Sequence, residues 1–437
     1  MPTVFIFNSG SSSLKFGLYS FEYIDGYSVD PMLNESQAMK TAKLSMLFEG
    51  VLEFNFENGR MGQSGKAQSN SEFNQAKLRI LNSKHEVLIS ETINVSNLLD
   101  ATHIIVRQLT DFNMPAPVVI GHRVVHGGAK LRHHCLINDE VLQQLKLACA
   151  FAPLHNKNAL SLIDITKTIY PHLPQVACFD TVFHAELPIV ARTLPLSKTL
   201  QSDGLQRYGF HGLSCESIIE QLNDKLPEKL IIAHLGHGAS VTAIKNGQSM
   251  DTSMGLTPTG GLMMGSRSGD LDPEILVYLM REKKFDVTML ENLINRESGL
   301  LGVSGVSGDL RELHKVASDN PDAQLAINMF CYSAAKQIAG MITTLNSVDM
   351  LVFTGGIGEN DHLVRYAVCQ SLNWAGIILD KTLNQTLVSH SKNNDNQDTV
   401  ISSIASKCEV RVMPSQEDKQ IAFHTTRLWQ SVASTYL

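Results

Sequence analysis

The sequence lacks several features that would assign it to a class at once. Its seven cysteines are scattered and form no C-x-x-C pair, which argues against a disulfide framework and a zinc site. No apolar run reaches the roughly 18 residues of a membrane-spanning helix. No basic region precedes the apolar residues near the N-terminus, so we expect no secretory signal. The interpretation is a cytoplasmic chain with free thiols and no membrane partner.

The chain also lacks an excess of positive charge and a P-loop. Its net charge of −7 provides no basic field, so nucleic acid is not expected as a partner. The motif G-x-x-x-x-G-K-[ST] opening a helix is missing. What is present is the composition of a globular protein, with 43% hydrophobic and 18% charged residues. A length of 437 residues predicts two domains.

The N-terminal stretch VFIFNSGSSSLK predicts a hairpin. Residues 4–7 form a short apolar run typical of a buried strand, residues 8–13 form a small-residue turn, and apolar residues alternate on the return. Backbone N–H groups and hydroxyls at such a tip can form an anion-binding nest, and Lys15 adds a positive charge. Phosphate binding and an ordinary Ser-rich hairpin both fit this stretch taken alone.

The remainder of the first half predicts an α/β domain. Residues 21–97 look polar and irregular, with a surface excursion over 55–74. Helical spacing covers residues 97–112, and a strand is expected at 118–120. Asn138 should cap a helix with an acidic first turn, and a further helix is expected at 159–169. A strand at 175–179 delivers Asp180 at its end.

The second half, from about residue 182, repeats the plan of the opening stretch. Residues 230–235 predict an apolar strand, 236–240 a Gly/Ser turn and 241–245 a returning strand. Asn246-Gly247 is a hairpin dipeptide. Ser214 is a candidate helix cap, helices are expected at 274–281, 323–344 and 419–431, and a strand at 351–353. Two strand–turn–strand units predict a duplicated architecture with two related domains facing one cleft.

Five small-residue or glycine-rich turns lie at predicted strand ends, where ligands bind in open α/β sheets. They are residues 8–13, 126–128, 236–240, 265–269 and 355–360. Charged and imidazole side chains accompany them: Arg123, Arg267, His155, His211, His234 and Asp180. Each alone has an ordinary interpretation, such as a surface ion pair, a packed histidine or a helix cap. Their joint occurrence beside the turns favours a binding site.

The motifs taken together resemble those of acetate kinases, the acetokinase family. FNSGSSSLKF, GHRVVHGG, APLHN, FDTVFH, YGFHG, HLGHGAS, GSRSGDLDP, SGLLGVSG and FTGGIGEN follow in the family's order along the whole chain. The resemblance implies two duplicated actin/hexokinase-like α/β domains flanking an ATP cleft. The expected domains are residues 1–180 plus 419–437 on the carboxylate and phosphate side, and 181–418 on the nucleotide side.

The resemblance further implies an activity, cofactors and partners. The activity is reversible in-line phosphoryl transfer between ATP and acetate, giving acetyl phosphate and ADP, with Mg2+ or its substitute Mn2+. Family members are cytoplasmic homodimers that serve acetyl-CoA biosynthesis. Carried over by motif, Asp180, His211, Arg267 and Arg123 are the catalytic residues, with Asp180 as the family's active-site acid/base. Asn8 and Glu417 hold the metal.

The binding residues are also carried over by motif. Substrate contacts fall to Arg123 for the carboxylate, to His155, and to a methyl pocket of Val125, Leu154, Phe210 and Pro258. Nucleotide contacts fall to Ser11, Ser13, Lys15, His234, Leu235, Gly236, His237, Gly238, Asp309, Leu310, Arg311, Gly356, Ile357, Gly358, Glu359 and Asn360.

Elementary chemistry agrees with these roles. Acetate, with a carboxyl pKa near 4, is already ionised at neutral pH, so the nucleophile needs no general base. Asp180 is therefore better interpreted as orienting other groups. Two arginines and a magnesium ion suit the repulsion between carboxylate and polyphosphate.

Two departures from the family pattern leave questions. His237 stands where the family most often has Asn and predicts ATP binding that changes with pH near 6.5. Gln416-Glu417-Asp418 leaves two candidate acids for the metal, of which we choose Glu417. One alternative is a propionate or other short-chain carboxylate kinase, although Val125 favours acetate. The others are an actin-like or Hsp70-like nucleotide-binding protein and an inactive relative.

Overall fold

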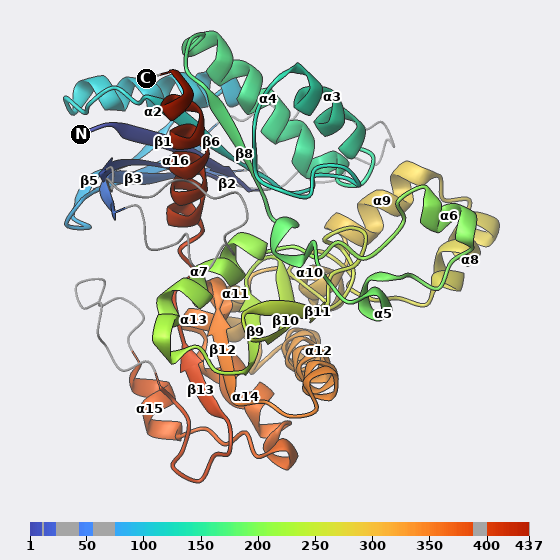
Figure 1. Cartoon of the computed structure of the whole chain (residues 1–437). Coiled ribbons are helices and arrows are strands. Elements are labelled where there is room, and N and C mark those ends of the chain that lie inside the picture. The colour runs from blue at the N-terminus through green and yellow to red at the C-terminus, as the bar shows by residue number, and fades with distance from the viewer. Residues whose placement is uncertain (11–12, 23–42, 56–74, 388–399, 437) are drawn as a thin grey trace. The chain divides into compact units, whose positions relative to one another are not determined.

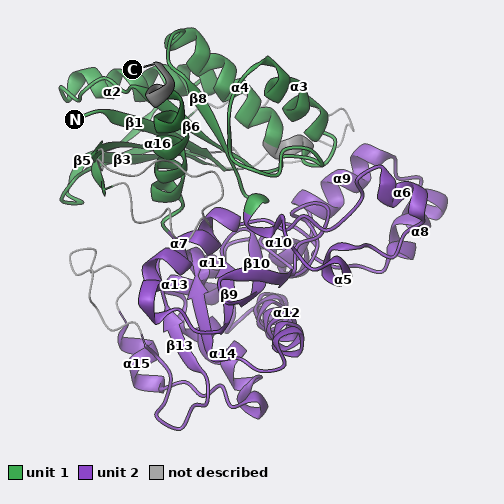
Figure 2. Ribbon diagram, viewed as in Figure 1, with its two compact units in different colours: residues 1–182, 416–437 green, residues 183–415 purple. Residues whose placement is uncertain are grey.

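The computed structural model describes residues 1–10, 13–22, 43–55, 75–387 and 400–436. The chain divides into two compact units, Met1–Val182 with Gln416–Leu437 (unit 1) and Phe183–Ser415 (unit 2), coloured separately in Figure 2. Among the described residues, no helix has the length and apolar character to cross a membrane.

Unit 1 is built on an 8-stranded sheet with the order β5-β4-β3-β2-β1-β6-β8-β7. Its strands are β1 (Thr3–Ser9), β2 (Ser13–Glu22), β3 (Lys43–Asn55), β4 (Gln75–Asn82), β5 (Val87–Ile93), β6 (Val119–Val124), β7 (Cys135–Leu136) and β8 (Gln175–Phe179). β1 and β2 form the predicted antiparallel hairpin, while β6 and β8 continue the sheet in parallel with β1. Phe5, Phe7, Phe16 and Phe48 lie in the hydrophobic core of this unit.

Four α-helices accompany this sheet in the described part of unit 1: α2 (Leu98–Asp111), α3 (Asp139–Ala148), α4 (Pro153–Ile169) and α16 (Glu417–Tyr436). Asn97 and Asn138 cap α2 and α3 by accepting hydrogen bonds from Asp100 N and Val141 N. The C-terminal helix α16 returns to pack on β1, β6 and β8 (Figure 1). Gly121 in β6 permits this approach, because a Cβ there would overlap Thr425.

Unit 2 contains a 5-stranded sheet with the order β11-β10-β9-β12-β13. Its strands are β9 (Lys229–Leu235), β10 (Ala239–Lys245), β11 (Gln248–Thr252), β12 (Met350–Thr354) and β13 (Glu409–Val412). Its helices are α5 (Ile189–Arg192), α6 (Lys198–Ser202), α7 (Gly212–Leu222), α8 (Pro273–Lys283), α9 (Val287–Arg296), α10 (Gly299–Ser304), α11 (Leu310–Val316), α12 (Pro321–Leu345), α13 (Gly355–Asn360), α14 (His362–Gln370) and α15 (Lys381–Thr386). Short 3-10 turns are η1 (Val182–His184), η2 (Asn223–Lys225) and η3 (Asn373–Ala375).

The two sheets repeat one topology. In unit 1, β3, β2 and β1 are antiparallel neighbours, and β6 and β8 follow in parallel. In unit 2, β11, β10 and β9 are antiparallel neighbours, and β12 and β13 follow in parallel. The duplication predicted from the two strand–turn–strand stretches is therefore present.

Two predictions of local structure are wrong. Residues 21–97 are not irregular throughout, because β3, β4 and β5 extend the first sheet there. The excursion expected at 55–74 lies almost wholly outside the described residues. Ser214 does not cap α7. His211 occupies the cap position, and Ser214 lies in the first turn with its hydroxyl on His234.

Candidate functional site

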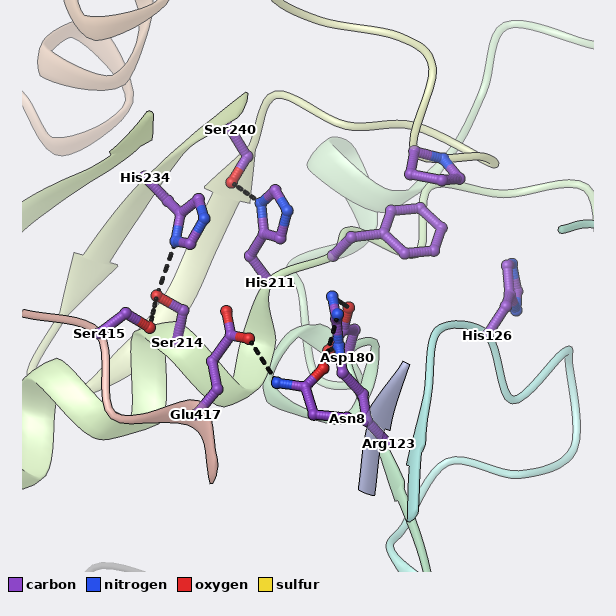
Figure 3. A network of polar contacts seen from close by, with 12 residues as sticks. Asn8, Arg123, His126, Asp180, His211, Ser214, His234, Ser240, Ser415 and Glu417 are labelled. Atoms are coloured by element: carbon purple, nitrogen blue, oxygen red, sulfur yellow. Dashed lines mark hydrogen bonds and ion pairs between the residues drawn. The ribbon is translucent and has the colours of Figure 1, made fainter. Parts of the chain in front are cut away.

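Three polar residues gather at the carboxyl ends of neighbouring strands in unit 1. Asn8 lies near the end of β1, Arg123 near the end of β6, and Asp180 directly after β8. These strands are adjacent and parallel, so their carboxyl ends meet at one edge of the sheet. Figure 3 shows the three side chains in contact. The sequence had placed these residues at predicted strand ends, and the family resemblance had assigned all three to the site.

Arg123 is held on two sides. Its Nε and NH2 donate to Oδ1 and Oδ2 of Asp180 at 2.9 and 2.6 Å, and its NH1 donates to Oδ1 of Asn8 at 3.0 Å. The Asp180 side chain is fully buried. Burial lowers the pKa of Arg123, but the carboxylates of Asp180, Glu417 and Asp418 outweigh it and raise the pKa above its ordinary value. The guanidinium stays charged, and three of its five N–H donors are used.

Asn8 also contacts two acids that open α16. Its Nδ2 donates to Oε2 of Glu417 at 3.3 Å and to Oδ1 of Asp418 at 2.7 Å. Burial, followed by smaller contributions from Glu417 and Glu49, raises the pKa of Asp418, although nearby Lys15 and the Asn8 hydrogen bond oppose the rise. A partly buried carboxylate beside a second one is an environment that a divalent cation would stabilise. Oxygen donors of this kind fit Mg2+.

Several residues predicted for unit 1 are only partly placed. Ser11 lies outside the described residues, and α4 begins at the segment that holds Leu154 and His155, whose side chains are also outside them. Ser13 opens β2, and its carbonyl oxygen accepts from Gly10 N at 2.8 Å. Lys15 is exposed in β2, in register with Asn8 across the hairpin.

The turn at residues 126–128, which follows β6, is held by hydrogen bonds. Val125 is buried directly after the strand. His126 is also buried, and its Nδ1 accepts from Gly128 N at 2.8 Å. Asn156 in α4 holds the backbone of His126 from both sides, since its Oδ1 accepts from His126 N and its Nδ2 donates to His126 O. The turn at 126–128 is thus tied to α4.

In unit 2, two imidazoles and a guanidinium lie around the turn between β9 and β10. His211 has a φ of 58°, a left-handed conformation that is unusual for a residue with a side chain. Its Nδ1 lies 3.0 Å from Ser240 Oγ, and its ring stacks on that of His234 with centroids 4.1 Å apart. A Cβ on Gly238 would lie 3.3 Å from Arg267 NH1 and 3.4 Å from His211 Nε2. Arg267 and His211 therefore face the same piece of backbone.

The conformation of His211 is supported by a residue that sequence reasoning did not assign. His184, from the FDTVFH motif, is buried; its Nε2 lies 3.0 Å from Phe210 O and its Nδ1 2.8 Å from Ser249 Oγ. Burial lowers the pKa of His184 to about 4, so the ring is neutral. The contact holds the backbone directly before His211. Elsewhere in unit 2, the carbonyl oxygen of Pro258 accepts a hydrogen bond from Arg267 NH1 at 3.0 Å.

The side chain of His237 is exposed to solvent on one side and packs against Gly265 on the other. A Cβ on Gly265 would meet its Nδ1 at 2.8 Å, so the imidazole packs directly on that glycine. Burial lowers the pKa of His237, Arg267 lowers it further, and Asp309 opposes both. The predicted titration near pH 6.5 is therefore moved to lower pH.

The two segments predicted to contact adenosine are tied together. Asp309 and Arg311 pair with each other, with Arg311 NH2 2.6 Å from Asp309 Oδ2. His314 in α11 reaches Asp361 Oδ2 at 2.8 Å, which links α11 to the start of α14. Sequence reasoning missed this link, because the two residues are 47 positions apart and neither belongs to a motif.

A buried arginine, Arg365, binds the backbone of the glycine-rich segment at residues 355–360. Arg365 NH1 donates to Gly358 O and Glu359 O at 2.9 and 3.0 Å, and its Nε donates to Asn384 Oδ1 at 2.8 Å. Burial lowers the pKa of Arg365 to about 10, so it stays charged at neutral pH. The Glu359 side chain faces inward, because its Oε1 accepts from Gly355 N and Ser415 N at 3.0 and 3.1 Å. The side chains of Arg365 and Glu359 therefore hold the backbone of this segment through hydrogen bonds.

Two mixed sheets of one topology, with glycine-rich turns and charged residues at their strand ends, define the actin- and hexokinase-like class of α/β proteins. Solved structures agree. A propionate kinase from Francisella tularensis has a TM-score of 0.79 at 33% identity, and the Porphyromonas gingivalis acetate kinase 0.76 at 31%. Each comparison covers 98% of this chain and 100% of the other.

The chain belongs to the acetokinase family, whose sequence model matches residues 3–423. The acetate kinase of Thermosynechococcus vestitus is 39% identical over 435 residues, which is 97% of both chains. That of Rhodopseudomonas palustris strain CGA009 is 43% identical over 314 residues, covering 71% of this chain and 76% of the relative. The family expected from the ordered motifs is confirmed.

Proposed function

We propose that this protein is an acetate kinase that transfers the terminal phosphoryl group of ATP to acetate, reversibly and by direct in-line attack. Family membership over residues 3–423 supports the reaction class. The observation that carries the proposal is the anchored guanidinium of Arg123 at the strand ends of unit 1. The proposed products are acetyl phosphate and ADP.

Arg123 is proposed to bind the acetate carboxylate. Its three internal hydrogen bonds leave two N–H donors, which is the number that a bidentate carboxylate contact needs. Acetate is ionised at neutral pH and requires no base. Both oxygens of Asp180 accept from Arg123, which supports a positioning role for this residue in place of proton transfer.

The acids that flank Asn8 are proposed to hold Mg2+. Glu417 and Asp418 provide the carboxylate oxygens, so the metal set predicted from sequence, Asn8 and Glu417, gains Asp418; the Asn8 amide nitrogen donates to both acids. When bound, the ion would neutralise charge on the nucleotide phosphates. Lys15 lies in register with Asn8 and adds a further positive charge on the same hairpin.

Arg267 and His211 are proposed to stabilise charge on the transferring group. Both lie against Gly238, so a phosphoryl oxygen near this turn would meet a guanidinium and an imidazole. Nucleotide binding is assigned to 234–238, 309–311 and 356–360. The predicted ATP cleft between the two domains stays a prediction.

Acetate and propionate are the two candidate substrates to compare, because one of the similar structures is a propionate kinase. Val125, Leu154, Phe210 and Pro258 are the proposed methyl pocket. Val125 is buried at the end of β6, two residues after Arg123, and its branched side chain favours acetate. One methylene is worth about 1–3 kcal/mol, so discrimination against propionate is expected to be partial.

We also propose that the protein is a cytoplasmic homodimer. Large apolar side chains are exposed on unit 2, among them Ile189 at 74%, Val190 at 86%, Val287 at 65% and Tyr332 at 64%. Apolar side chains exposed to this degree mark surfaces that associate with partners when they are contiguous. Light scattering should give about twice the 48.1 kDa mass of the chain.

The test of the proposed function is acyl phosphate formation, trapped with hydroxylamine, from Mg-ATP and acetate. Activity should vanish when a chelator removes the metal and should be lower with propionate. ATP binding without acyl phosphate from either acid would reject the proposal and favour a nucleotide-driven binding protein.

A further inference from the structure

A chain of hydrogen bonds in unit 2 ends on His234. Ser415 Oγ donates to Ser214 Oγ at 3.0 Å, and Ser214 Oγ lies 2.8 Å from Nδ1 of His234. Figure 3 shows the two hydroxyls and the imidazole in line. Ser214 is fully buried in the first turn of α7, His234 belongs to β9, and Ser415 follows β13. None of the sequence motifs assigned a role to either serine.

The direction of the first hydrogen bond leaves the Ser214 hydrogen available for the second. A serine hydroxyl has one hydrogen to donate. Because Ser415 donates to Ser214, the Ser214 hydrogen is available for Nδ1 of His234. When Ser214 donates that hydrogen, the imidazole nitrogen accepts it and the ring proton is on Nε2. We propose that Ser214 and Ser415 are positioning residues that hold His234 as the neutral tautomer protonated on Nε2.

Ser415 is itself held in place. Its backbone N–H donates to Oε1 of Glu359 at 3.1 Å, and the same oxygen accepts from Gly355 N at 3.0 Å. The hydroxyl of Ser415 is therefore fixed relative to the glycine-rich segment after β12. The whole arrangement, from Gly355 to His234, lies within unit 2.

The fixed tautomer has two consequences, both of which rest on the proposed function. Nε2 of His234 lies 3.7 Å from the position of a Cβ on Gly236, so this nitrogen is next to the turn assigned to the nucleotide phosphates. In addition, His234 stacks on His211 at 4.1 Å, and two cationic rings at this separation would repel each other. A neutral His234 leaves His211 as the ring that can carry positive charge toward the transferring group.

The tautomer can be measured in the free protein, without activity. Protein labelled with 15N-histidine is studied by long-range 1H–15N correlation at pH 7.5, and the His234 signals are assigned from their loss in His234→Gln. The expected pattern is a protonated Nε2 and an unprotonated Nδ1, altered in Ser214→Ala. A protonated Nδ1 or an imidazolium at His234 in the unsubstituted protein would overturn the proposal.

Kinetics provide the second measurement, with a control on the same helix. Ser214→Ala and Ser415→Ala should raise the KM for ATP about tenfold, the effect of one lost hydrogen bond, and leave the KM for acetate unchanged. Ser415→Thr keeps the hydroxyl and should restore the value. Ser217→Ala is the matched control, because Ser217 Oγ donates to Ser214 O at 2.8 Å and takes no part in the chain.

The outcomes separate the two proposals. Unchanged KM for ATP in both alanine variants, or an equal rise in Ser217→Ala, would reject the positioning role. The expected tautomer in a protein that forms no acyl phosphate would support the hydrogen-bond chain and reject the proposed function.

Discussion

Arg123 is held by side chains of the protein itself. Asp180 binds one edge of its guanidinium and Asn8 one nitrogen of the other edge, and the same Asn8 amide donates to Glu417 and Asp418. A preorganised charge loses little entropy when the ligand arrives. The residue that binds carboxylate and the residues that suit the metal are therefore parts of one hydrogen-bonded unit.

Removal of either arginine should lower turnover by about two decades or more, as expected for lost stabilisation of transition-state charge. Arg123→Ala also leaves the buried Asp180 without its cation, so its unfolding midpoint should be measured together with kcat. Arg267→Ala provides the comparison in unit 2. Near-normal turnover in a folded variant would remove that arginine from the site.

Asp180→Asn tests the positioning role of this acid. The amide can still accept one hydrogen bond from Arg123 but carries no charge, so we expect kcat to fall by about 10- to 100-fold with a higher KM for acetate. The pH dependence of kcat should keep its shape, because no proton is transferred. If the acidic limb of the pH profile of kcat disappears in Asp180→Asn, Asp180 would instead be assigned a role in proton transfer.

His237 should not make ATP binding pH-dependent around neutrality. Burial and Arg267 lower its pKa below the ordinary 6.5, against Asp309, so the ring is already neutral at pH 7. The KM for ATP should be constant from pH 7 to 8 and should change only below about 6.5. His237→Asn is the control, and it should keep the same neutral-pH value. A step in the KM between pH 7 and 8 that disappears in His237→Asn would contradict this account.

At the residue level, the sequence predicted what strand ends bring together. Asn8, Arg123 and Asp180 could be grouped because parallel neighbouring strands end at one edge. Asp418 could not be chosen over Glu417, because adjacent residues at a helix start both fit the motif. The predicted helix-cap role of Ser214 was wrong, because a hydroxyl near a helix start resembles a cap in the sequence. Only the fold brings His234 next to this hydroxyl.

At the level of elements, the sheets extend further than expected. β4 alternates buried Ala76, Leu78 and Ile80 with exposed Lys77 and Arg79, a period of two that the sequence did contain. β5 is mostly exposed, so its sequence carries little hydrophobic signal. The polar character of the surrounding region hid both strands.

Gly121 tests how α16 is docked. A Cβ at this position would overlap the Thr425 side chain, so Gly121→Val should force α16 from β6 and destabilise unit 1 by about 1–3 kcal/mol. Because α16 begins with Glu417 and Asp418, activity should decrease as well. Urea unfolding monitored by circular dichroism measures the first effect.

The control for this substitution is Gly340→Ala in α12, where a Cβ would meet nothing within 4 Å. It should be neutral or should stabilise the helix slightly. An unfolding midpoint for Gly121→Val equal to that of the unsubstituted protein would contradict the close packing of α16.

At the level of the whole molecule, each unit contains a buried neutral histidine. Burial lowers the pKa of His122 in unit 1 and of His184 in unit 2 from 6.5 to about 4. In the unfolded chain both rings take up protons below pH 6.5, whereas in the folded chain they remain neutral. Stability should therefore be complete above pH 6.5 and fall toward pH 4, by about 1.4 kcal/mol per pH unit for each histidine.

Urea titrations at pH 7.5, 6.0 and 5.0 measure this loss, and His122→Gln should flatten part of the slope. The control is His103→Gln, which removes an exposed imidazole in place of a buried one. A free energy of unfolding that is constant between pH 6.5 and 5 would show that the buried rings accept protons without cost.

The central claim is phosphoryl transfer to a carboxylate, and hydroxamate trapping of acyl phosphate measures it most directly. The protein is incubated with Mg-ATP and either acetate or propionate, in parallel with Arg123→Ala and with a chelator. We predict strong acetate-dependent product, less with propionate, and none without metal. ATP binding with no acyl phosphate from either acid would contradict the account.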